Sequence, residues 1–131
     1  MTTASTAGPV GLLVVGHGSR RPEANEVVHA VARSLASRLP SWVVQAAFLE
    51  LLSPTIAEGY AALVAAGCGR VVAHPYFLFP GNHSTVDIPA ALRAAEAEHG
   101  SLPWTVTAPL DLDPRIVDVV LDRVMTALEG S

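Results

Sequence analysis

The sequence contains no lysine, and its eight basic residues are all arginines spread along 131 positions. They form no basic stripe, and the formal net charge is −4 with the histidines neutral. Proteins bind nucleic acids through clustered positive charge. We therefore expect no nucleic-acid partner.

Cysteine is nearly absent, because Cys68 is the only one. One cysteine excludes an internal disulfide and a thiolate metal cluster within one chain. Its setting, Gly67-Cys68-Gly69, is typical of a turn between a helix and a strand, so we interpret Cys68 as structural. The lack of disulfides favours a cytoplasmic location.

Long hydrophobic runs are also missing, although half of the residues are hydrophobic. The apolar runs are far shorter than the roughly 20 residues that a membrane-spanning helix needs, so we expect no membrane segment. Residues 1–9 carry no positive charge and no long apolar stretch, and we interpret them as a disordered lead-in rather than a secretory signal. Residues 10–131 then form a single domain of ordinary size.

Short apolar runs alternate with amphipathic segments along the rest of the chain. Continuous apolar runs are typical of strands buried on both faces, and a four-residue apolar repeat is typical of helices. The predicted strands cover 10–15, 42–49, 70–79 and 104–108, and the predicted helices cover 22–39, 53–67, 86–98 and the segment from 113 onward. This order predicts a three-layer α/β fold with a four-stranded parallel sheet, helices on both faces and the flavodoxin-like strand order 2-1-3-4.

Several local signals refine this prediction. Pro75 lies within the third predicted strand and should cause a bulge or a loosened end, because proline cannot donate to a strand ladder. Ser53-Pro54 predicts a helix start with a serine cap and proline in the first turn, and Asp113-Pro114 predicts the same for the last helix. Residues 80–84 read as a loop. We assign the apolar stripe of the last helix to the core; it contains Val117, Val120, Leu121, Val124 and Leu128.

Polar residues follow the first three predicted strands. His17 comes after the first strand, Glu50 after the second and His83 just beyond the third. In an open parallel sheet, ligands bind beyond the carboxyl ends of the strands where the strand order reverses, which is here between the first and third strands. We therefore expect His17 and His83 to flank a crevice, with Glu50 beside it.

These residue types suit a weakly held divalent metal. Neutral imidazole is a good ligand for Co²⁺, Ni²⁺, Fe²⁺ and Zn²⁺, and Glu50 could accept a proton or add a ligand. Glycines at Gly16, Gly18 and Gly81 would permit sharp turns and the close approach of a bulky substrate. The adjacent arginines could pair with substrate carboxylates, with one of the two the better candidate; they are Arg20 and Arg21.

Simpler interpretations stay open for each of these residues. His17 could cap the following turn, and His83 could be an exposed loop histidine. Glu50 could be a solvated carboxylate near a helix N-terminus, where the helix dipole favours negative charge. The arginines could be solvent-exposed charges.

Four motifs in order give the chain a family resemblance. They are Leu12-Leu13-Val14-Val15-Gly16-His17-Gly18-Ser19-Arg20 with Pro22-Glu23-Ala24-Asn25, Ala47-Phe48-Leu49-Glu50 with Ser53-Pro54, Tyr76-Phe77-Leu78-Phe79-Pro80-Gly81-Asn82-His83, and Asp87-Ile88-Pro89. Together they resemble the small single-domain sirohydrochlorin chelatases of the class II chelatase family, the sirohydrochlorin cobaltochelatase type. The resemblance covers about residues 10–93.

The resemblance implies an enzyme that inserts Co²⁺ first, with Fe²⁺ or Ni²⁺ as further metals, into sirohydrochlorin in cobalamin or siroheme biosynthesis. It assigns His17 and His83 as catalytic metal ligands and Glu50 as the acidic residue, with no organic cofactor. It places the tetrapyrrole against the glycines and arginines named above and Ser19, in a cleft between two copies. The histidines would hand over the metal while a histidine or Glu50 accepts the departing protons.

Other functions compete with this one. A tetrapyrrole or metal carrier could use the same crevice without turnover. A histidine phosphatase would place arginine before the reactive histidine, where this chain has Gly16. The loop that follows also lacks the third glycine and the lysine of nucleotide-binding motifs. A purely structural module would leave the gathering of polar residues at the switch point unexplained.

Overall fold

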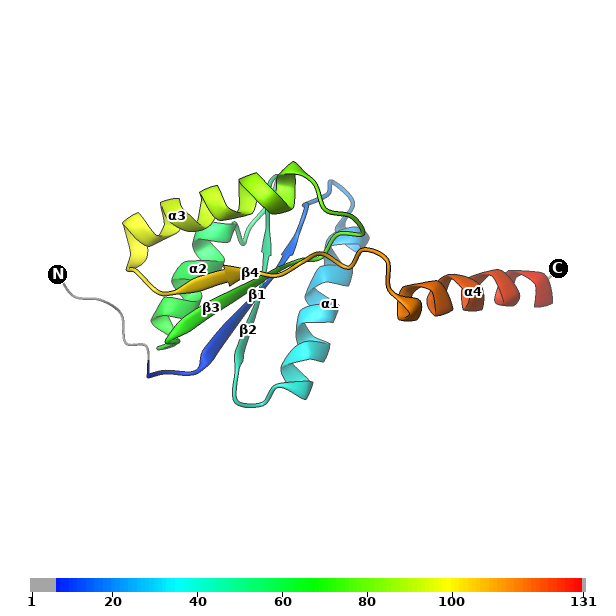
Figure 1. Ribbon diagram of the computed structural model, residues 1–131, viewed down its shortest axis with the longest axis horizontal. Coiled ribbons are helices and arrows are strands. Elements are labelled where there is room, and N and C mark those ends of the chain that lie inside the picture. The colour runs from blue at the N-terminus through cyan, green and yellow to red at the C-terminus, as the bar shows by residue number, and fades with distance from the viewer. Residues whose placement is uncertain (1–6, 131) are drawn as a thin grey trace.

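The computed structural model describes residues 7–130 and shows a parallel sheet of four strands in the order β2-β1-β3-β4, with helices on both faces (Figure 1). The predicted α/β class and strand order are confirmed. The elements are β1 (Val10–Gly16), α1 (Pro22–Arg38), β2 (Val43–Phe48), α2 (Ile56–Ala65), β3 (Arg70–Pro75), η1 (His83–Asp87), α3 (Ile88–His99), β4 (Trp104–Val106) and α4 (Pro114–Glu129).

Two apolar clusters hold the sheet between its helices. Alternate residues of a strand point to opposite faces, so each central strand contributes to both clusters. On one face, Leu13 and Val15 of β1 pack with the buried residues of α2 and α3. On the other face, Leu12 and Val14 pack with Val28 and other residues of α1. The strand that carries His17 at its end is therefore firmly held.

β3 ends earlier than predicted. The sequence predicts a strand over residues 70–79, whereas β3 stops at Pro75. Pro75 still aligns with Val15 of β1, and the next residue, Tyr76, donates its N–H to the carbonyl of Val15. We expected a loosened strand end at Pro75, because proline has no N–H to donate. The structure confirms this, since the chain leaves the sheet as a loop after Tyr76.

The predicted start of α2 is wrong. Ser53 does not cap this helix, and Pro54 does not lie in its first turn, because Thr55 is the N-cap. The Thr55 side chain accepts the N–H of Glu58, and the Glu58 carboxylate accepts the N–H of Thr55. This reciprocal capping box satisfies two N–H groups and outweighs the weaker serine signal. Ser53 instead donates its hydroxyl to the Glu58 carboxylate.

We predicted a loop over residues 80–84, but only its first part is a loop. His83 begins the π-helical turn η1, which continues directly into α3. The carbonyl of Gly81 accepts hydrogen bonds from the N–H groups of Ser84 and Thr85. These bonds start the helical winding at Gly81, so the backbone is already helical at His83. The histidine is consequently carried by the beginning of a helix.

The last helix does not join the core, which corrects our assignment of its apolar stripe. Asp113 caps α4 and Pro114 occupies its first turn, as predicted. However, none of its residues is buried, and α4 extends away from the sheet (Figure 1). Within the described residues, one face of the sheet is therefore covered by α2 and α3, and the other by α1 alone. Amphipathicity shows that a helix has a face to bury but not where it buries it.

Of the lead-in expected over residues 1–9, residues 1–6 lie outside the described part of the chain. The carbonyl of Pro9 accepts a hydrogen bond from the N–H of Gly69. Between residues 7 and 130, no helix is both long enough and apolar enough to cross a membrane. Cys68 is buried and unpaired by any disulfide at the turn that precedes β3.

Candidate functional site

The structure brings His17 and His83 together at the carboxyl edge of the sheet. His17 follows β1, and His83 lies on the segment that follows β3, the strand adjacent to β1. Their ring centroids are 4.9 Å apart, with the ring planes nearly perpendicular at 87°. This is the crevice position predicted from the strand order.

Phe77 holds the ring of His17. The two rings are stacked, with centroids 3.9 Å apart and planes inclined by 22°. Partial burial lowers the pKa of His17 below its usual value, and the adjacent His83 lowers it further, while the Glu50 carboxylate opposes both. His17 is therefore neutral at pH 7, the form in which an imidazole nitrogen can bind a metal.

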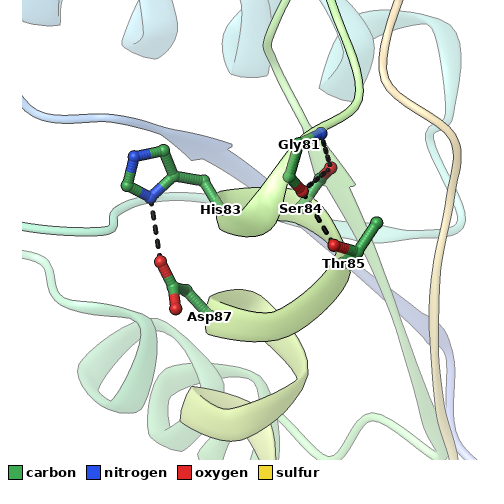
Figure 2. A network of polar contacts seen from close by, with 5 residues as sticks. All are labelled: Gly81, His83, Ser84, Thr85 and Asp87. Carbon is green, nitrogen blue, oxygen red and sulfur yellow. Dashed lines mark hydrogen bonds and ion pairs between the residues drawn. The ribbon is translucent and has the colours of Figure 1, made fainter.

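The ring of His83 is oriented by Asp87. Its Nδ1 lies 2.9 Å from Oδ2 of Asp87, one helical turn further along. Figure 2 shows the other ring nitrogen directed away from the carboxylate. A carboxylate on one nitrogen favours the tautomer that leaves the lone pair on the other, which is a common arrangement around metal-binding histidines.

The turn that carries His83 is anchored at Gly81. Its carbonyl accepts the hydroxyls of Ser84 and Thr85, at 3.1 and 2.9 Å, in addition to their N–H groups (Figure 2). Gly81 itself has open space where a Cβ would stand. The His83 side chain is exposed, but the hydrogen bonds to Gly81 hold the backbone of this turn in place.

Glu50 lies beside His17. Its N–H donates to the carbonyl of His17 at 3.1 Å, so the ends of β1 and β2 are joined at this point. The Glu50 side chain is exposed, and its charge acts on the pKa of His17. The structure therefore places Glu50 next to the crevice, as predicted, but on its solvent side.

The glycines around His17 serve close packing within the chain. A Cβ on Gly16 would stand 2.7 Å from Val28 of α1, and a Cβ on Gly18 would stand 1.9 Å from the carbonyl oxygen of Glu50. Gly18 also has a φ of +95°, which confirms the sharp turn expected there. The side where we expected a substrate to approach these two glycines is filled by Val28 and Glu50.

The rest of the predicted site is a loop that leads into α1. Ser19 is held through its backbone, since its N–H donates to the Asn25 side chain and its carbonyl accepts from the same amide. Its hydroxyl accepts the N–H of Arg21. Both arginines are exposed at the sheet edge, and Arg21 is the N-cap residue of α1. Asn25 ends one of the motifs that carry the family resemblance, but the sequence alone predicted no role for it.

A hollow of about 420 Å³ opens beside the histidines. Its lining residues are His17, Tyr76, Phe77, Leu78, Phe79, Pro80, Gly81 and His83. Leu78 and Phe79 are largely exposed at its rim. Within residues 7–130, no cluster of three or more histidine, cysteine, aspartate or glutamate side chains could hold a metal ion. One chain therefore offers two imidazoles beside an apolar wall, not a closed metal cage.

Sequence reasoning missed two residues of this site. Phe77 read as part of a strand, although its ring stacks on His17. Asp87 read as a helix residue, although it orients His83. The four-residue spacing of His83 and Asp87 was a usable signal, but only if the helix had been predicted to begin at His83.

The model of the CbiX family matches residues 11–127. This chain belongs to the CbiX family. A sirohydrochlorin cobaltochelatase from Methanosarcina acetivorans is 37% identical over 126 residues, which are 91% of this chain and 97% of that protein. A chloroplastic sirohydrochlorin ferrochelatase from Arabidopsis thaliana is 36% identical over 118 residues, 90% of this chain.

Some relatives of this CbiX chain are about twice its length. The matched region is 52% of the Arabidopsis protein. The structure of the sirohydrochlorin chelatase SirB from Bacillus subtilis subspecies spizizenii, in complex with cobalt, superposes with a TM-score of 0.83 at 29% identity. That match covers 90% of this chain and 50% of the SirB chain. The CbiX chain thus corresponds to about half of these longer proteins.

Proposed function

We propose that this CbiX chain inserts Co²⁺, or alternatively Fe²⁺ or Ni²⁺, into sirohydrochlorin. The carrying observation is the pair His17 and His83, whose ring centroids lie 4.9 Å apart at the switch point of the sheet. The names of the relatives, cobaltochelatases and a ferrochelatase, support the reaction. The cobalt complex of SirB supports the metal. Cobalt, iron and nickel all suit imidazole, so the chain itself does not rank them.

The two histidines would bind the incoming metal without trapping it. His17 is neutral at pH 7 because its pKa is lowered, and His83 turns one nitrogen outward because Asp87 occupies the other. Two protein ligands leave the remaining coordination positions for water and then for the ring nitrogens. Such a site can release the metal as well as hold it, which metal insertion requires.

The apolar wall of the hollow would receive the macrocycle. Phe77, Leu78 and Phe79 present flat or aliphatic surface next to the histidines. The exposed arginines after β1 could pair with peripheral carboxylates of the ring, as Arg20 and Arg21 lie at the same edge of the sheet. Ser19 and the glycines would shape this edge, with Gly81 as the glycine that borders the hollow.

Two protons leave the ring nitrogens when one divalent metal enters. Asp87 would stabilise a protonated His83, because its carboxylate already contacts Nδ1. Glu50 offers a second, solvent-exposed acceptor beside His17. The protein would therefore accept the protons at the groups that surround the metal and pass them to water.

We also propose that two copies form the cleft, and that the protein acts in the cytoplasm. The half-length match to SirB supports the pairing, since a second copy would supply the other half of such a molecule. Leu78 and Phe79 of the hollow are largely exposed on one chain, so a second copy would find apolar surface there. The lack of disulfides, with Cys68 as the sole cysteine, supports the location.

The test is anaerobic insertion kinetics, following the absorbance of sirohydrochlorin with Co²⁺, Fe²⁺ or Ni²⁺. His17→Ala and His83→Ala should reduce the rate to that of a protein-free control, and Asp87→Asn should reduce it roughly 10–100-fold. His99→Ala is the matched control, because it removes an imidazole at the far end of α3 and should leave the rate unchanged.

Two results would contradict the proposal. Full activity in folded His17→Ala or His83→Ala protein would remove the histidines from the reaction. Saturable binding of sirohydrochlorin by wild type with no acceleration of metal insertion would make the chain a carrier that uses the same crevice.

A further inference from the structure

Leu51 has a backbone conformation that suits leucine poorly. Its φ is +75°, in the left-handed region, where the Cβ of an L-residue crowds the following carbonyl oxygen. Among the described residues, Asp111, with a φ of +54°, is the other non-glycine residue with a positive φ. A short polar side chain such as that of aspartate can offset this cost by local hydrogen bonding, whereas leucine cannot. The conformation of Leu51 is therefore strained.

The side chain of Leu51 also gains little from burial. It is 62% exposed, and it belongs to neither of the two apolar clusters formed by residues 7–130. Its neighbour Leu52, by contrast, packs against the cluster on the α1 side of the sheet. Strained residues that the surrounding structure maintains gather at active sites and ligand clamps. A strained leucine that is left exposed to water therefore points to an apolar contact with a ligand.

The loop that carries Leu51 is held at both ends. At its start, the N–H of Glu50 donates to the carbonyl of His17 at 3.1 Å. At its end, the carbonyl of Pro54 accepts the N–H of Phe48 at 2.8 Å, which closes the loop. The backbone that carries Leu51 is therefore fixed relative to the backbone that carries His17.

Leu51 and the rim of the hollow belong to the loops on either side of His17. The strand that leads to His17, β1, lies between β2 and β3. Leu51 follows β2, whereas Leu78 and Phe79 at the rim follow β3. Adjacent strands are only about 4.8 Å apart. A tetrapyrrole centred on a metal at His17 and His83 is much wider than this spacing, so it would extend over the loops that follow all three strands.

We propose that Leu51 is a substrate-binding residue that packs against the tetrapyrrole on the β2 side of His17. The macrocycle would then have apolar contacts on both sides of the metal, at Leu51 and at the rim of the hollow. Contacts on both sides hold a flat ring against tilting, which keeps its nitrogens directed at the metal. The inference rests on the proposed function, because it takes the ligand to be sirohydrochlorin.

Two substitutions separate the backbone of Leu51 from its apolar side chain. Asparagine branches at Cγ like leucine and adopts a positive φ more readily, but it lacks the apolar surface. Methionine keeps the apolar surface and the unfavourable φ. Leu51→Asn should therefore raise the urea midpoint of unfolding above that of wild type, whereas Leu51→Met should leave it unchanged. A residue that served only the fold would instead lose stability in Leu51→Asn.

The binding assay titrates metal-free sirohydrochlorin into each full-length variant under anaerobic conditions and follows its absorbance. Leu51→Asn should weaken the affinity roughly five- to twentyfold, because an apolar contact is lost, and Leu51→Met should stay within about twofold of wild type. The control is Val119→Asn, which removes a side chain that is 48% exposed on α4. Because α4 extends away from the sheet (Figure 1), the affinity of this variant should equal that of wild type.

Three results would overturn the role of Leu51. Unchanged affinity in Leu51→Asn, with metal insertion by wild type intact, would remove Leu51 from the site and leave the chelatase proposal standing. A lower urea midpoint in Leu51→Asn would mean that the side chain serves the fold. Weaker self-association in analytical ultracentrifugation, with unchanged affinity for the ring, would assign Leu51 to a contact between copies.

A fourth result would separate the two proposals in the other direction. Wild-type protein that binds sirohydrochlorin without accelerating metal insertion would contradict the chelatase proposal. If Leu51→Asn then still weakened this binding, the role of Leu51 in holding the ring would be supported.

Discussion

The two faces of the sheet are covered to different extents. On the α2 and α3 side, Leu13, Leu63 and Leu92 are completely buried, and the cluster continues without interruption from β2 to β3. On the α1 side, the fully enclosed residues lie over β1 and β2, while Leu35 and Tyr76 are only partly buried. One face is complete within a single chain, and the other is not.

The two faces therefore contribute to the stability of the fold in different ways. Burial that is complete within one chain stabilises the fold at any protein concentration. Apolar surface that stays half exposed stabilises a fold only when something covers it, and its contribution then depends on concentration. The site histidines lie at the edge between the two faces, so the complete face holds them in position even in a single copy.

The largest expected effect comes from truncating the complete face. Leu63→Ala should lower the free energy of unfolding by about 2–5 kcal/mol, because it leaves a cavity among fully buried neighbours. Leu35→Ala should cost about 1 kcal/mol, since its side chain is partly solvated already. Urea unfolding of the two variants measures both losses. Equal losses would show that the two faces are packed alike.

A polar tie on the complete face gives the next effect. The Tyr60 hydroxyl donates to the carbonyl of Gly100 at 2.6 Å and accepts the N–H of Leu102 at 2.9 Å, so it joins α2 to the segment before β4. Tyr60→Phe leaves the buried N–H of Leu102 without this acceptor and should cost about 1–3 kcal/mol. An unchanged urea midpoint would mean that water replaces the hydroxyl.

The helix caps sharpen the comparison further. Thr55→Ala removes the capping box of a packed helix and should destabilise the whole fold by about 1 kcal/mol. Asp113→Ala removes the N-cap of α4, a helix that has no buried residue. This substitution should lower the helix content measured by circular dichroism without moving the main unfolding transition. A shift in that transition as large as that of Thr55→Ala would show that α4 is packed within one chain.

The smallest effect is a pH dependence on the open face. Burial lowers the pKa of His74, and a backbone hydrogen bond to Ala108 partly opposes this. As the pH falls below about 6.5, the unfolded chain binds this proton before the folded chain does. Stability should therefore decline from about pH 6.5 toward the lower pKa of the folded state. Urea midpoints should fall more steeply for wild type than for His74→Phe, and parallel profiles would exclude His74 as a cause.

Local patterns were sufficient for the order of elements but not for their ends. The run Val10–Val15 identified β1, and Asp113-Pro114 identified the start of α4. The start of α2 was misplaced because serine and threonine are both good caps, and the reciprocal partner Glu58 decided between them. The turn at His83 was missed because its winding depends on hydrogen bonds to Gly81.

The sequence alone determined the α/β class, the strand order and the meeting of His17 with His83, because right-handed crossovers between parallel strands leave few arrangements. Only the tertiary structure decided that Phe77 stacks on His17 and that Asp87 orients His83, since these contacts depend on where β3 ends and η1 begins. It also decided that α4 leaves its own sheet. An apolar stripe shows that a helix has a face to bury, but only the tertiary structure shows whether the chain's own sheet buries it.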